Sequence, residues 1–247
     1  MTPAERRAAL EAIAADVRDC TRCRLSATRT HAVPGEGDAN TEVLFVGEGP
    51  GEQEDRQGRP FVGASGQLLT ELIASLGWSR EDVFITNVVK CRPPGNRDPQ
   101  PDEIEACAPH LARQLAAIDP AVVVTVGKHS LERFRPGDRI SRSHGTTRAI
   151  DPATGASNAL AFAMYHPAFA LYQRSNRPIL FEDIQRLPAA LVESRERRAM
   201  DGAREPSSAA PTTHAAPAVA TPPATTTPTT SDAPPAPADD VDQLTIF

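Results

Sequence analysis

Four cysteines are the residues whose types and spacing point most directly to chemistry. Cys20 and Cys23 form a C-x2-C pair, whereas Cys91 and Cys107 are separated by fifteen residues. Four thiols can hold either a tetrahedral zinc ion or a [4Fe–4S] cluster. Zinc modules usually carry two C-x2-C pairs, and here the second pair is divided between an irregular segment and a helix, which favours the larger cluster. A zinc ion and four unrelated buried thiols are the alternatives.

A glycine-rich segment at residues 47–63 is the second candidate site. It begins with GEGPGEQED and ends with GRPFVG. Glycines let the backbone approach a ligand closely, and Glu48 and Glu54 add carboxylates to that geometry. The segment is not a dinucleotide fingerprint, because Glu52 stands where the last glycine is required, and it lacks the Lys-Ser/Thr pair of a phosphate-binding loop. A plain strand-to-helix turn is the alternative.

The periodicity of apolar residues predicts the elements that would position both sites. Strands are expected at residues 43–46, 83–89, 121–126 and 159–165, and helices at 4–19, 66–76, 101–117, from 127 onward and at 178–198. Segment 91–99 should be irregular, because it contains three prolines and a glycine. The alternation of strands with helices predicts an α/β fold in which a parallel sheet lies between helices.

The composition of the chain changes at about Ala199. From there the sequence is rich in alanine, proline, threonine and serine, which cannot bury enough apolar surface to offset the entropy of ordering. We therefore expect one folded domain at residues 1–198 and a disordered linker at 199–238. Six acids and one base after residue 198 contribute most of the formal charge of −6 and leave 25 bases and 26 acids in the domain. A near-neutral domain neither indicates nor excludes binding to nucleic acid.

The sequence gives no sign of association with a membrane. No stretch is long and apolar enough to span one, and the first residues lack the apolar core of a signal peptide. We therefore expect a cytoplasmic protein, in which the four cysteines would not form disulfides.

Three motifs, together with the four cysteines, resemble the family 4 uracil-DNA glycosylases. The motifs are GEGPGE…GRPFVG at residues 47–63, NVVKCRPP at 87–94 and HPA at 166–168, and the resemblance covers about residues 12–195. It implies a three-layer αβα fold with a central four-stranded parallel sheet, and a [4Fe–4S] cluster held by Cys20, Cys23, Cys91 and Cys107 as a structural element. It also implies an enzyme of base excision repair that flips uracil out of DNA and hydrolyses its N-glycosidic bond, leaving an abasic site.

The resemblance assigns the recognition of uracil to three side chains. Phe61 would stack on the flipped base. Asn87 would read its Watson–Crick edge by donating to O4 and accepting from N3–H, a pattern that cytosine does not satisfy. His166 would donate a hydrogen bond to O2 as negative charge develops there. Asn87 and His166 are therefore expected to act in both binding and catalysis.

The activation of water is assigned to a carboxylate near the first glycines. In other branches of the superfamily an aspartate stands two residues after the first glycine of this loop, and here that position is Gly49, which is expected to border the uracil site. Glu48 is the candidate that polarises the water and stabilises the sugar cation, with Glu54 as the alternative. Glu54 is otherwise expected near C5 of uracil, where it would exclude the methyl group of thymine.

Two further features concern contacts with DNA. Phe169 and Leu171 could wedge into the space that the flipped base vacates, with simple core packing as the alternative. One related branch traps its product covalently through a histidine on a basic loop, and no such run follows Asn87, so turnover is expected. The substrate would be uracil-containing DNA, single- or double-stranded, and the protein is expected to be a monomer.

The last residues form a short apolar motif after an acidic spacer. Residues 239–247 resemble the peptide by which bacterial repair proteins bind the β sliding clamp. The side chains that carry this resemblance are Gln243, Leu244, Ile246 and Phe247. The flexible linker would then hold the enzyme near the clamp at raised effective concentration. The alternative to an enzyme is a non-catalytic or other-lesion iron–sulfur module that binds DNA and is tethered to the clamp.

Overall fold

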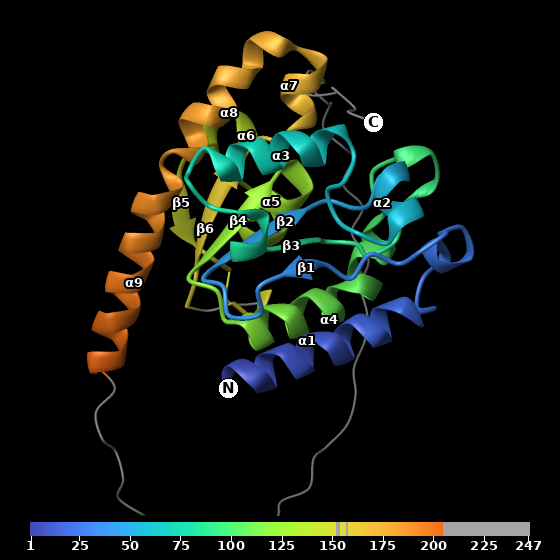
Figure 1. Cartoon of the computed structure of the whole chain (residues 1–247), viewed down its shortest axis with the longest axis horizontal. Helices are drawn as coiled ribbons and strands as arrows, with labels where there is room; N and C mark the ends of the chain where they lie inside the picture. The colour runs from blue at the N-terminus through green and yellow to red at the C-terminus, as the bar shows by residue number, and fades with distance from the viewer. Residues whose placement is uncertain (152–153, 157, 205–247) are drawn as a thin grey trace, which may run out of the picture.

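A six-stranded sheet forms the centre of the computed structural model, which describes residues 1–151, 154–156 and 158–204 (Figure 1). The strand order is β1-β3-β2-β4-β6-β5. The strands are β1 (Glu36–Gly37), β2 (Val43–Gly47), β3 (Phe84–Asn87), β4 (Val122–Val126), β5 (Thr147–Ala149) and β6 (Leu160–Met164). The four predicted strands are β3, β2, β4 and β6, and these pair in parallel. Short antiparallel strands, β1 and β5, extend the two edges.

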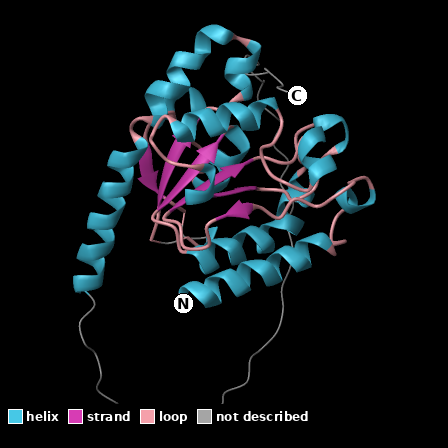
Figure 2. Cartoon of the chain, in the orientation of Figure 1, coloured by secondary structure: helices cyan, strands magenta, loops and turns pink. Residues whose placement is uncertain are grey.

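Helices cover both faces of the sheet, as Figure 2 shows, and this confirms the predicted three-layer αβα architecture. On one face lie α1 (Pro3–Arg18) and α4 (Pro101–Ile118). On the other lie α3 (Ala64–Ala74), α8 (Arg177–Ile184) and α9 (Leu187–Arg204). Successive side chains of β2 serve opposite layers: Leu44 packs toward α1 and α4, whereas Phe45 packs toward α3. A strand buried on both faces therefore reads as a continuous apolar run.

The remaining helices are short and follow strands or loops near the end of the sheet where its parallel strands finish. They are α2 (Glu52–Gln57), α5 (Lys128–Phe134), α6 (Ile140–Ser143) and α7 (Ala168–Tyr172). Helix α2 lies within the glycine-rich segment that we expected to be a loop. Because parallel strands point the same way, the residues after β2, β3, β4 and β6 all emerge at this carboxyl edge, where open α/β sheets bind ligands.

The end of the domain differs from expectation in two places. The single helix predicted at 178–198 is wrong: two helices, α8 and α9, stand there, because Pro188 would clash with the carbonyl of Ile184 in a continuous helix. Helix α9 also continues to Arg204, six residues past the expected end of the domain. The rest of the linker and the motif with Gln243, Leu244, Ile246 and Phe247 lie outside the described residues. Within the described part of the chain, no helix is long and apolar enough to cross a membrane.

Candidate active site and cysteine cavity

Three of the predicted site residues stand at the carboxyl edge of the sheet. Glu48 directly follows β2, Asn87 is the last residue of β3, and His166 is the second residue after β6. The backbone also ties the first two segments together, since Val89 N donates to Glu48 O at 3.0 Å. The fold therefore brings side chains that are 118 positions apart in sequence to one end of the sheet.

Asn87 has a buried polar atom without a partner. The residue is 1% exposed, and its Oδ1 accepts no hydrogen bond from the described part of the chain. The adjacent glycine makes room for it: a Cβ on Gly47 would lie 2.5 Å from Asn87 Oδ1 and 2.5 Å from Phe61 Cζ. Leaving an acceptor buried and unsatisfied costs roughly 1–3 kcal/mol, so this geometry favours a ligand with a matching donor.

Phe61 is held in a left-handed backbone conformation that bulky residues rarely adopt. Its φ is +50°, and the ring is buried with its centroid 5.9 Å from that of the His166 ring. Arg80 fixes the backbone by donating from Nη1 to Phe61 O at 3.1 Å and from Nε to Glu36 at 3.0 Å. Gly66 is required beside it, because a Cβ there would lie 1.9 Å from Phe61 O. Strain of this kind is characteristic of functional sites.

His166 is a neutral imidazole with one donor free for a ligand. Ala168 N donates to His166 Nδ1 at 3.2 Å, so the ring proton is on Nε2. Burial lowers the pKa of His166 to about 4, although the charge of Glu54 acts to raise it. The ring is therefore uncharged at neutral pH and presents an N–H rather than an imidazolium.

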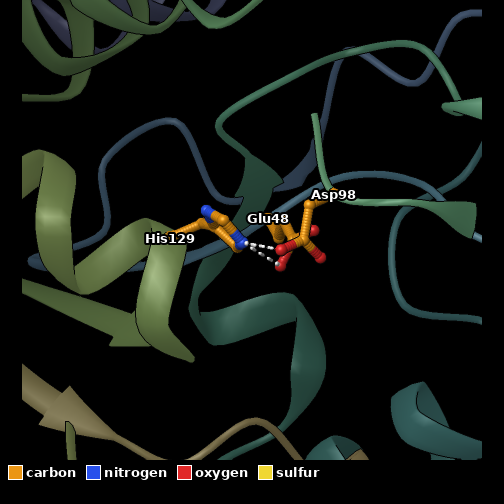
Figure 3. Close-up of side chains that lie close together, drawn as sticks. All are labelled: Glu48, Asp98 and His129. Carbon is orange, nitrogen blue, oxygen red and sulfur yellow. Dashed lines mark ion pairs between the residues drawn. The ribbon is translucent and has the colours of Figure 1, made fainter. Parts of the chain in front are cut away.

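Glu48 forms a cluster with His129 and Asp98, which Figure 3 shows converging. His129 Nε2 lies 2.9 Å from Asp98 Oδ2 and 3.7 Å from Glu48 Oε2. Burial raises the pKa of Glu48, and Asp98 adds to that rise, whereas His129 and Lys128 oppose it. Lys128 also binds Asp98 at 3.0 Å. A carboxylate with a raised pKa, two-thirds enclosed and beside a histidine, is suited to exchange protons with water.

Sequence reasoning missed His129 and Asp98. His129 comes three residues after the end of β4, so the rule that ligands gather at the carboxyl ends of parallel strands could have found it. Asp98 lies in the irregular segment after β3, where no pattern fixes its direction.

The Glu54 carboxylate accepts hydrogen bonds from backbone N–H groups, and Gly49 is closely packed. Glu54 Oε1 accepts from the backbone N–H groups of Val62 and Gly63, both at 2.8 Å, and its Oε2 accepts from Gly51 N at 3.1 Å. The carboxylate thus joins the start of α2 to the segment that follows Phe61. Gly49 leaves no space for a side chain, because its Cβ would lie 2.8 Å from Val89 Cγ2. The contact of Glu54 with C5 of a base stays a prediction.

The two wedge candidates lie on α7 in different surroundings. Phe169 stacks on Tyr165, with ring centroids 4.2 Å apart and planes at 14°. Leu171 is 43% exposed, and its neighbour Tyr172 is 67% exposed. Phe169 therefore has a packing partner in the free protein, while Leu171 is accessible to a partner; the wedge role of both residues stays a prediction.

The four cysteines line one cavity on the side of the sheet that α1 and α4 cover. Two donors already point at their sulfur atoms: Arg29 Nη1 lies 3.0 Å from Cys91 Sγ, and Lys90 N lies 3.2 Å from Cys107 Sγ. Burial raises the pKa of Cys91 and raises that of Cys107 to about 11. His110 also lines the cavity, and neither of its ring nitrogens finds a partner among the described residues.

Lys90 is buried between this cavity and Asn87. It is 1% exposed, and burial lowers its pKa to about 7 against the influence of Cys107, which raises it. Its Nζ donates to Asn87 O at 2.8 Å. Sequence analysis did not single out Lys90, because its contacts depend on tertiary structure.

Comparison with known proteins gives consistent matches over the whole domain. The family model of the uracil DNA glycosylase superfamily matches residues 34–187. The type-4 uracil-DNA glycosylase of Saccharolobus solfataricus is 48% identical over 186 residues, which cover 74% of this chain and 86% of the relative. That of Sulfurisphaera tokodaii is 48% identical over 187 residues, with 72% and 83% covered. That of Thermotoga maritima is 45% identical over 179 residues, with 72% and 92% covered.

Proposed function

The chain belongs to the uracil-DNA glycosylase superfamily and within it to the type-4 uracil-DNA glycosylases, and we propose that it excises uracil from DNA in base excision repair. The reaction is hydrolysis of the N-glycosidic bond, which releases uracil and leaves an abasic site. The observation that carries the proposal most directly is the buried Oδ1 of Asn87, which lacks a partner within the described residues. Uracil offers the N–H that this oxygen requires.

Recognition begins with a base that has left the DNA stack, since an enzyme cannot reach its glycosidic bond inside a duplex. The ring of Phe61 would pack against the flipped base, supported by a backbone that Arg80 and Gly66 hold rigid. Asn87 Oδ1 accepts from uracil N3–H while Nδ2 donates to O4. Cytosine presents an acceptor at N3 and a donor at N4, so both contacts would fail and leave buried groups unpaired.

Departure of the base requires stabilisation of the negative charge that develops on uracil. As the bond from C1′ to N1 breaks, its electron pair stays on uracil, and negative charge spreads onto O2. The Nε2–H of His166 donates to O2, and its proton position is fixed because Nδ1 accepts from Ala168 N. A neutral donor with a pKa of about 4 for its conjugate acid stabilises the anion without transferring its proton.

Glu48 is the group that we assign to the attacking water. Its ionised carboxylate would accept a proton from the water as the oxygen bonds to C1′, and its charge would stabilise the positive sugar. Desolvation raises the pKa of Glu48 and makes its carboxylate a stronger base than an exposed glutamate, whereas His129 opposes that rise. Glu54 would act indirectly, since its oxygens hold the segment after Phe61, and it would border the C5 position with Gly49.

The cysteine cavity fits a [4Fe–4S] cluster held by Cys20, Cys23, Cys91 and Cys107. The unpartnered nitrogens of His110 and the donors aimed at two sulfurs suit a group rich in sulfur acceptors. A zinc thiolate site would bring sulfurs to within about 3.8 Å of one another. In the described chain the sole set of three ligand atoms within 4.8 Å is that of Glu48, Asp98 and His129, so no three of the thiol sulfurs lie that close together. When bound, the cluster supplies cross-links between α1, α4 and the segment after β3.

The test of the function is release of free uracil from a labelled single-stranded oligonucleotide. We expect the protein to produce an alkali-sensitive abasic site at uracil and none at thymine or cytosine at the same position. An intact strand, from folded protein that contains iron, would contradict the proposal and favour the non-catalytic module. A double-stranded oligonucleotide with a U·G or U·A pair would then establish the preferred substrate.

The exposed face of α7 and the end of the chain are proposed to bind partners. Leu171 would enter the gap left by the flipped base. Residues 243–247 would bind the β sliding clamp, and removal of these five residues should abolish clamp binding while excision on free oligonucleotides stays unchanged. Equal clamp affinity of the shortened protein would refute this role. We further propose that the enzyme acts in the cytoplasm as a monomer.

A further inference from the structure

Lys90 is a fully buried lysine placed between the two functional regions. It is 1% exposed, three residues after Asn87 and one before Cys91. No carboxylate forms an ion pair with it within the described residues, whereas the exposed Lys128 has Asp98 as its partner. A buried ammonium without a counter-charge is very costly, so its surroundings need an explanation.

The side chain of Lys90 donates three hydrogen bonds, the number that an ammonium can donate. Its Nζ lies 2.5 Å from Thr86 Oγ1, 2.8 Å from Asn87 O and 2.7 Å from Gln114 Oε1. Pro34 O uses the donors of two of these groups, since it accepts from Thr86 Oγ1 at 2.9 Å and from Gln114 Nε2 at 2.7 Å. All three atoms that face Nζ accept from it. Three donors are available from an ammonium and only two from a neutral amine.

The cysteine cavity offers the missing counter-charge. Four thiolates around a dicationic [4Fe–4S] core leave the whole group dianionic. The backbone N–H of Lys90 donates to Cys107 Sγ at 3.2 Å, so the residue borders the cluster ligands directly. Two arginines are further cations here: Arg29 lies 3.0 Å from Cys91 Sγ, and Arg22 lines the cavity.

We propose that Lys90 is a buried counter-ion of the cluster and a positioning residue that links the cluster to the main chain of Asn87. The inference deepens the proposed function and rests on its iron–sulfur cofactor. Lys90 lies between the cluster, whose charge it balances, and the end of β3, where Asn87 faces the base. Loss of the cluster would leave the buried ammonium without its counter-charge.

The test uses purified holoprotein with Lys90→Met, which keeps the length and apolar stem of the side chain but removes the charge. We expect the variant to lose its visible cluster absorbance in excess chelator at least about tenfold faster than wild type, because the cluster loses its buried counter-charge. Its cluster should also have a more negative reduction potential, since adding an electron is harder without the neighbouring cation. kcat/KM for uracil excision should fall in the variant that still retains iron.

Two further variants separate this role from general destabilisation. Arg113→Gln removes an exposed cation of α4 that pairs with Asp16, and it should change neither chelator resistance nor potential. Thr86→Val keeps the shape of the site but removes one acceptor from the ammonium, so it should speed cluster loss to a smaller extent. It provides the same test if Lys90→Met fails to fold.

The outcomes distinguish this inference from the proposed function. Chelator resistance and potential equal to wild type in both Lys90→Met and Thr86→Val would overturn the role of Lys90, whether or not the protein excises uracil. Wild-type protein that excises uracil but contains no iron would overturn both the cofactor and the role of Lys90. Wild-type protein with iron but no excision would refute the glycosylase activity, and the chelator and potential measurements would still decide the counter-ion role.

Discussion

Replacing Asn87 with alanine should separate catalysis from stability. In the free protein Asn87 Oδ1 is buried without a partner among the described residues, so the side chain already carries a desolvation cost of about 1–3 kcal/mol. Alanine removes that cost and loses some packing. We therefore expect the free energy of unfolding to change by no more than about 1 kcal/mol.

The effect on excision should be much larger. With alanine, uracil N3–H and O4 lose both partners at a position where the native Asn87 is 1% exposed, at roughly 2 kcal/mol each. The total of about 4 kcal/mol corresponds to a fall of roughly a thousandfold in kcat/KM. The assay is single-turnover release of uracil from a single-stranded oligonucleotide, paired with urea unfolding of the same preparation.

The matched control for this prediction is Asn40→Ala. Asn40 is exposed in the segment before β2, at the opposite end of that strand, and its side chain donates to Asp38 Oδ1 at 3.4 Å. This control should keep wild-type kcat/KM. An Asn87→Ala variant that excises uracil within tenfold of wild type would refute the reasoning, and so would a severe loss of stability.

Three further predictions concern other parts of the site. His129→Gln removes a charge that lowers the pKa of Glu48, so the acid limb of the kcat/KM profile should move to higher pH; an unchanged limb would contradict this. The pKa of His166 falls from 6.5 to about 4 on folding, so protonation favours the unfolded chain below pH 6.5. Wild type should therefore lose stability between about pH 7 and pH 5, and His166→Gln should reduce that loss by up to about 2 kcal/mol, as measured by urea unfolding. Gly66→Ala should displace Phe61 and abolish excision, and retention of wild-type kcat/KM would argue against a required backbone at Phe61.

The parts of the fold predicted from sequence are those fixed by local patterns. The four parallel strands are apolar, β-branched runs buried on both faces, so they can be recognised as strands from the sequence alone. Strands β1 and β5 have two and three residues and exist only because a neighbouring strand pairs with them. Helix α2 was missed because glycine and proline surround it, and its first turn depends on the Glu54 carboxylate.

In the candidate site, too, the residues fixed by local patterns could be predicted, and those that depend on tertiary contacts could not. Glu48, Asn87 and His166 could be predicted because they end or follow strands within recognisable motifs. Two of the three backbone partners of the Glu54 carboxylate lie eight and nine positions later, so the direction of this side chain could not be predicted from the sequence. The contacts of Lys90 with Gln114 and of His129 with Asp98 join separate elements, so they emerge only in the folded chain.

The central claim is that Glu48, Asn87 and His166, at the carboxyl end of the sheet, form the site that hydrolyses the glycosidic bond of uracil. The most direct measurement is single-turnover excision from a uracil-containing oligonucleotide by wild type and by Glu48→Gln, together with the affinity of each for the same DNA. We predict that wild type excises uracil and leaves thymine intact, and that Glu48→Gln binds with similar affinity but excises at least about a hundredfold more slowly. Absence of excision by wild type, or equal rates for both proteins, would contradict the account.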